Sequence, residues 1–135
     1  MTYVVMMKKY SIKERELADG VKGNVLGCDL LRVVQFESNQ EYNINEILHV
    51  PFDCCTKGFK EEYEDTSLCT FRIIGKEHVL VHYTQSIVQE DYTILEVDTF
   101  TSRKDSVTVD DMKHDVSSPT VLELFKKIKG LTILS

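Results

Sequence analysis

Four extended runs follow one another in the second half of the chain, with no helical pattern between them. They are Ser67 to Ile74, His78 to Thr84, Tyr92 to Phe100 and Ser106 to Met112. Gly75-Lys76-Glu77 separates the first two runs and predicts a hairpin turn. Strands spaced this closely leave no room for the crossover helices of a βαβ sheet. The chain is therefore predicted to be mostly β, an antiparallel meander or up-and-down β-barrel.

One amphipathic helix is predicted to follow these strands, from Pro119 to Lys129. Proline fits the first helical position, where its missing N–H costs nothing, and Gly130 ends the pattern. Either Ser117 or Ser118 can cap the first turn. The apolar side of this helix needs a sheet or barrel wall to cover. That side consists of Val121, Leu124, Phe125 and Ile128.

The first half of the chain gives weaker signals. Ser11 to Glu14 fits a capping box and predicts a short N-terminal helix that stops at Gly20. Leu30 to Phe36 is rich in branched residues and predicts a strand, and Tyr42 to Val50 predicts a weaker one. The chain shows no linker-like tract, and its 135 residues suit one hydrophobic core. Residues 1–135 are therefore predicted to form a single domain.

The charge of the chain excludes nucleic acid as its main partner. The sequence has 16 basic and 22 acidic side chains, a net charge of −6, whereas phosphate binding needs a surplus of Lys and Arg. No apolar run approaches the roughly 18 residues of a membrane-spanning helix. The N-terminal apolar patch is short and precedes its lysines, which is the wrong order for a secretory signal. We expect a cytoplasmic protein if Met1 is the native start, and a secreted one if a signal has been removed.

The four cysteines, Cys28, Cys54, Cys55 and Cys69, allow free thiols or one or two disulfides. A bond between the adjacent Cys54 and Cys55 would be strained. The sequence has no CxxC pair and no histidine at finger spacing from a cysteine, so we expect no metal site from these thiols.

Nothing in the sequence indicates a reaction, and neither enzymatic activity nor a cofactor is expected. There is no glycine-rich phosphate loop and no framed serine nucleophile. His78 and His82 lie four residues apart on one predicted strand, about 13 Å, which is too far for one metal ion. Glu96 and Asp98 share a strand face and could mimic a catalytic carboxylate pair. Alternating acids are common on the solvent face of antiparallel strands, so we interpret both as surface residues.

Three segments of the chain carry a family resemblance. Glu90-Asp91-Tyr92 opens the strand from Thr93 to Thr99, Ser117-Ser118-Pro119 leads into the C-terminal helix, and Val21 to Val25 contains a Gly-Asn-Val triplet. The first segment resembles the Thr-Asp-Tyr element of the lipocalins. The second resembles the family's strand-to-helix junction, and the third resembles its Gly-x-Trp signature. Lipocalins are up-and-down β-barrels that hold a small ligand inside.

The resemblance is restricted to part of the chain. It covers roughly residues Thr66 to Leu131 and is poor before them. The chain has no tryptophan, so Val25 stands where the family has the Trp of its signature. Lys113 lies several residues early for the basic residue that packs over that Trp.

The resemblance implies a non-enzymatic binding protein that sequesters and transports a small apolar ligand. The side chains expected to line its cavity lie on the more apolar strand faces. They are Phe71, Val79, Val81, Tyr83, Leu95 and Val97. The alternative is a β-rich protein–protein interaction module, such as an inhibitor or modulator, with no small ligand. That module would meet its partner through a sheet face or through the acidic segment from Glu61 to Asp65.

Overall fold

The computed structural model describes residues 1–16, 20–83, 87–104, 120–127 and 131–133. Six strands account for most of these residues: β1 (Thr2–Glu16), β2 (Lys22–Glu37), β3 (Ile47–Pro51), β4 (Leu68–Tyr83), β5 (Gln89–Thr99) and β6 (Leu131–Ile133). The helical segments are short: the 3-10 turn η2 (Phe52–Cys54), α1 (Lys57–Glu62) and α2 (Val121–Lys126).

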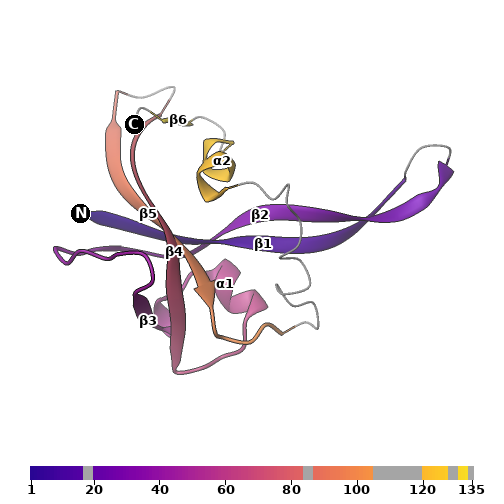
Figure 1. Cartoon of the computed structure of the whole chain (residues 1–135), viewed down its shortest axis with the longest axis horizontal. Helices are drawn as coiled ribbons and strands as arrows, with labels where there is room; N and C mark the ends of the chain where they lie inside the picture. The colour runs from indigo at the N-terminus through magenta and orange to yellow at the C-terminus, as the bar shows by residue number, and fades with distance from the viewer. Residues whose placement is uncertain (17–19, 84–86, 105–119, 128–130, 134–135) are drawn as a thin grey trace.

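The strands form one sheet in the order β2-β1-β5-β4-β3, and β6 pairs with the far end of β4. The sheet curls into a half-barrel (Figure 1). The predicted mostly-β class with a C-terminal helix is therefore confirmed. The meander is interrupted at its centre, because β1 and β5 pair in parallel from Thr2 beside Tyr92 to Met6 beside Glu96. The other four pairings are antiparallel.

The interior strand β1 is buried on both faces from Tyr3 to Met7, as expected for a parallel pair inside a sheet. Tyr3, Val5 and Met7 point to one face, and Val4 and Met6 point to the other. Each face carries its own hydrophobic cluster. The first core contains those three β1 residues together with Val33, Val34, Leu48, Val50, Phe52, Cys55, Phe59, Tyr63, Cys69, Phe71, Ile73, Leu95 and Val97. The second core contains Val4, Met6, Val79, Val81, Ile94, Val121 and Phe125.

A β-bulge in β4 sends the two halves of this strand into different cores. Cys69, Phe71 and Ile73 are buried in the first core, and the register shifts between Ile73 and Gly75. The extra residue reverses the alternation, so the next buried positions belong to the second core. The predicted turn at Gly75-Lys76-Glu77 is wrong, because this glycine marks a bulge in one continuous strand and not a hairpin end.

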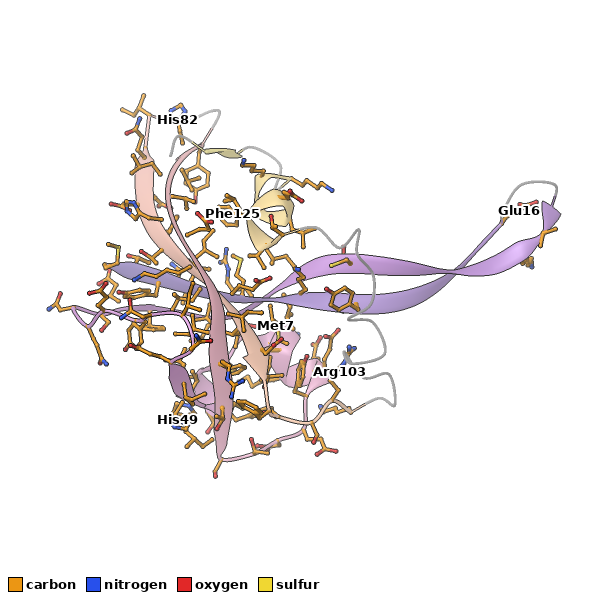
Figure 2. The ribbon with its side chains drawn as sticks, viewed as in Figure 1. Met7, Glu16, His49, His82, Arg103 and Phe125 are labelled. Atoms are coloured by element: carbon orange, nitrogen blue, oxygen red, sulfur yellow. The ribbon has the colours of Figure 1, made fainter. Side chains whose placement is uncertain are left out.

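The predicted helix from Ser11 to Gly20 is also wrong. β1 continues to Glu16 and pairs with β2 along its whole length, from Thr2 opposite Glu37 to Glu16 opposite Lys22. Strand pairing here overrides a local capping pattern that is a weak preference by itself. The distal part of this hairpin projects beyond the rest of the fold, with Glu16 at its far end (Figures 1 and 2).

The segment η2–α1 covers the first core. Thr56 caps α1 by accepting a hydrogen bond from the Phe59 N–H, and the Thr56 N–H donates to the Val33 carbonyl at 2.8 Å. The helix is thereby tied to the edge of β2. Phe59 is fully buried, and its ring stacks on Tyr63 at a centroid distance of 4.4 Å.

The helix α2 covers the second core with Val121 and Phe125. It lies on the other side of the sheet from α1, and Phe125 lies far from His49 on β3 (Figure 2). The predicted C-terminal helix is confirmed over Val121–Lys126, and its cap is Thr120. Ser117, Ser118 and the predicted strand from Ser106 to Met112 lie outside the described residues.

Candidate binding surface

One face of β3, of the first half of β4 and of the end of β5 remains exposed. We define the open face as Ile47, His49, Pro51, Leu68, Thr70, Arg72, Asp98 and Phe100. The residues between them, such as Leu48, Val50 and Phe71, are buried in the first core. The residues of the open face, which alternate with these buried residues along the strands, must therefore point the other way, because successive side chains alternate across a sheet.

Strand register brings the members of the open face together. Ile47 lies opposite Arg72, which in turn lies opposite Asp98. Three large apolar side chains stay accessible on this surface: Ile47 is 43% exposed, Leu68 49% and Phe100 59%. The guanidinium of Arg72 sits over the Phe100 ring, 5.5 Å from its centroid. The open face thus combines apolar area with a cation held by an aromatic ring.

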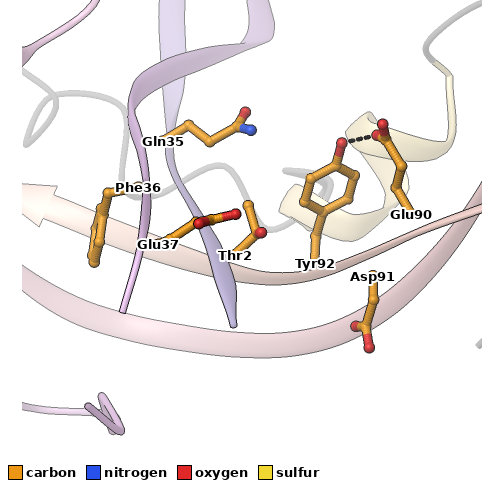
Figure 3. Close-up of a pocket in the computed structure, with 7 residues that line it drawn as sticks. All are labelled: Thr2, Gln35, Phe36, Glu37, Glu90, Asp91 and Tyr92. Carbon is orange, nitrogen blue, oxygen red and sulfur yellow. Dashed lines mark hydrogen bonds between the residues drawn. The ribbon is translucent and has the colours of Figure 1, made fainter. Parts of the chain in front are cut away.

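A pocket of about 410 Å³ lies at a different place, where β1 and β5 begin and β2 ends. Its lining is mainly polar and acidic, formed by Thr2, Gln35, Phe36, Glu37, Glu90, Asp91 and Tyr92 (Figure 3). Glu90 accepts two hydrogen bonds at this pocket: the Tyr83 hydroxyl donates to its Oε2 at 2.8 Å, and the Tyr92 hydroxyl donates to the same atom. The hydrogen bond to Glu90 is the main cause of a raised pKa at Tyr83.

The structure divides the predicted ligand-binding residues between the two cores. Phe71, Leu95 and Val97 lie in the first core, and Val79 and Val81 in the second. Tyr83 packs beside the second core with its hydroxyl on Glu90. The first five are at most 2% exposed. None of the six is among the residues that line the pocket.

The predicted surface acids on β5 differ in their surroundings. Glu96 is half-buried, and its Oε1 lies 3.6 Å from Lys8 Nζ. Burial is the main reason that the pKa of Glu96 is raised; Lys8 opposes the shift and Asp98 adds to it. The neighbouring β1 strand supplies Lys8, a pairing that spacing along β5 cannot reveal.

The histidines and cysteines form no metal site within the described part of the chain. His78 contacts Asp91 across β4 and β5, and His49 shares a hydrogen bond with Thr70 on the open face. His114 lies outside the described residues. The four cysteines, all of them described, form no disulfide. Burial, followed by the neighbouring Cys69, raises the pKa of Cys55 to about 12.

The sequence does contain a pattern that indicates the buried part of β1. Val4-Val5-Met6-Met7 is an uninterrupted apolar run, the pattern of a strand buried on both faces. The open face had no such signal, because its members alternate with core residues in the same way as any solvent-facing positions.

No protein family model, curated protein or solved structure matches the chain. The resemblance to lipocalins therefore stays a prediction. Neither helix in the described part of the chain is long and apolar enough to cross a membrane.

Proposed function

We propose that the chain is a non-enzymatic binding protein whose partner is another protein, bound at the open face. The observation that carries this proposal is the exposure of Ile47, Leu68 and Phe100 on one side of strands whose other side is buried. Isolated exposed apolar residues are ordinary, whereas several on one sheet face are typical of an interaction surface.

The chemistry of the open face fits a protein partner. Aromatic residues and arginine are enriched at protein interfaces, and Phe100 and Arg72 are in contact here. Covering this pair would remove apolar area from water. A carboxylate of the partner could reach the guanidinium from the solvent side. We therefore infer a partner surface with apolar side chains around at least one acid.

A small apolar ligand has less support. The apolar side chains predicted to hold it fill the two cores, and the pocket at the start of β1 and β5 is lined by Glu37, Glu90 and Asp91. Apolar ligands are bound by predominantly apolar walls. The prediction of a ligand-sequestering barrel remains untested.

Matched variants test the proposed surface. Leu68→Glu and Phe100→Glu place charge on the open face, whereas Leu80→Glu changes a similarly exposed residue of β4 beyond the bulge, where even-numbered positions face the opposite side. Partners captured on the immobilised chain are identified by mass spectrometry, and their affinities for each variant are measured by calorimetry. We expect the wild type and Leu80→Glu to bind alike, and the two open-face variants to bind at least about tenfold more weakly.

Two results would overturn the proposal. One is a partner that binds all four proteins equally, provided that circular dichroism shows them folded. The other is a native mass spectrum in which the purified chain carries a stoichiometric apolar molecule and no protein partner binds at micromolar concentration.

A further inference from the structure

The hairpin of β1 and β2 is longer than the sheet that supports it. β5 pairs with β1 only as far as Met6, whereas β1 and β2 stay paired to the far end of the hairpin. On the side of β2, the hydroxyl of Thr56 at the start of α1 donates to the Arg32 carbonyl. We define the distal ribbon as residues 7–16 of β1 and 22–31 of β2, which project beyond these contacts (Figures 1 and 2).

Neither edge of the distal ribbon has a neighbouring strand among the residues that the structure describes. In an antiparallel pair, every second residue of each strand directs its N–H and C=O groups away from the other strand. A two-stranded ribbon by itself is only marginally stable in water, and additional strands stabilise it. The two edges are therefore places where a further strand can add through main-chain hydrogen bonds.

The two edges differ in how well they are protected against such pairing. Six of the nine residues from Lys8 to Glu16 in β1 are charged, and four of these six are basic. Charged residues are a common protection of edge strands, because like charges repel across a new strand pair. In β2, only Lys22 and Asp29 are charged among the nine residues from 22 to 30, and proline is absent there. The outer edge of β2 is thus the unprotected one.

We propose that two copies of the chain associate through the outer edges of their β2 strands, which pair antiparallel about a two-fold axis. The two distal ribbons then form one four-stranded antiparallel sheet in the order β1-β2-β2-β1. A ladder over residues 22–30 spans about 30 Å. This interface is separate from the open face, because β2 and β3 are at opposite ends of the strand order.

The charges of β2 favour a second copy as the occupant of this edge. Lys22 and Asp29 are exposed and stand near opposite ends of the distal part of β2. An antiparallel copy brings the basic end of one strand beside the acidic end of the other. With the two-fold axis at Leu26, the middle of this stretch, Lys22 lies opposite Leu30 of the other copy and Asp29 lies opposite its Gly23. No two like charges then face each other across the new pair.

Sedimentation velocity of the full chain at about 1–200 μM tests the association. We expect a monomer–dimer equilibrium in the wild type. Leu26→Lys places two cations opposite each other at the two-fold axis and is expected to raise the dissociation constant about tenfold. The matched control is Ile12→Lys, because Ile12 is the partner of Leu26 across the hairpin and lies on β1. We expect this control to dimerise like the wild type.

Hydrogen exchange of the wild type locates the interface without any substitution. Raising the protein concentration is expected to protect alternate amides of residues 22–30 in β2 and to leave those of residues 8–16 in β1 unchanged. A failure of Leu26→Lys to fold therefore leaves the test intact.

Three results would overturn the proposal. The first is a wild-type chain that stays monomeric at about 200 μM, including the case in which a different protein protects the β2 amides. The second is a dimer that Ile12→Lys and Leu26→Lys weaken equally. The third is a dimer that Leu68→Glu on the open face dissociates while Leu26→Lys does not.

Discussion

Gly75 and Glu96 are cross-strand partners at the bulge of β4, and a Cβ atom at position 75 would lie 3.2 Å from Glu96 Oε2 and 3.3 Å from Glu96 Cβ. Glu96 is half-buried and held beside Lys8, so its side chain has little freedom to yield. We expect Gly75→Ala to lower the free energy of unfolding by about 1–3 kcal/mol, the usual cost of overpacking. Urea titration of the wild type and the variant measures this difference in free energy.

A double-mutant cycle separates this collision from other effects of the alanine. If contact with Glu96 is the cause, Gly75→Ala costs less in a Glu96→Ala background than in the wild type. An equal loss in both backgrounds would place the cause in the bulge backbone instead.

Glu96 also predicts a pH dependence of stability. Burial raises its pKa in the folded protein above the ordinary value, so the folded state binds the proton more tightly than the unfolded state. Its contribution to stability is fully present below the unfolded-state pKa and is lost as pH rises through the folded-state pKa. We expect Glu96→Gln to lack this loss. Urea titrations at a series of pH values measure the free energy of unfolding of both proteins. From about pH 4 upward, this free energy is expected to rise in the variant relative to the wild type. A constant difference would contradict the prediction.

The cysteines are expected to differ in alkylation rate. With a pKa of about 12 against an ordinary 9.0, the thiolate fraction of Cys55 at neutral pH is about a thousandth of that of an unperturbed thiol. Iodoacetamide is therefore expected to label exposed Cys54 first and Cys55 only on opening of the fold. Timed peptide mapping of the native protein follows both sites, and mild denaturant is the control that should remove the difference. Equal rates in the native protein would contradict the burial of Cys55.

Thr120 is expected to be important for covering the second core. Its hydroxyl accepts a hydrogen bond from the Glu123 N–H at 3.2 Å, and the Glu123 carboxylate accepts one from the Thr120 N–H at 3.3 Å. Thr120→Ala is expected to cost about 1 kcal/mol of stability, and Thr120→Ser a few tenths at most. Hydrogen exchange of the α2 amides should accelerate in the alanine variant alone. Equal behaviour of the two variants would indicate that the cap contributes nothing.

The sequence predicted those elements whose pattern is local. The alternation from Tyr92 to Phe100 gave β5, and the spacing of Val121 and Phe125 gave α2. Both patterns depend on which side of a single segment is buried, which neighbours in the sequence are enough to reveal.

Pairing between distant segments could not be predicted in this way. The glycine at position 75 has the same local appearance in a turn as in a bulge, and only the position of β5 distinguishes the two. The open face was hidden for a related reason. Leu68 and Ile47 look like ordinary strand residues until the register shows that they share a surface.

The parallel pairing of β1 with β5 has a consequence for biosynthesis. Thr2 pairs with Tyr92, so the centre of the sheet joins segments from the start and the far part of the chain. Such high contact order slows folding, because a long loop must close before its contacts stabilise anything. Val4 to Met7 leave the ribosome before β5 is synthesised, so their second neighbour strand does not yet exist at that stage. During that interval a run of four apolar residues is open to aggregation, which makes a nascent-chain chaperone most valuable until β5 has been synthesised.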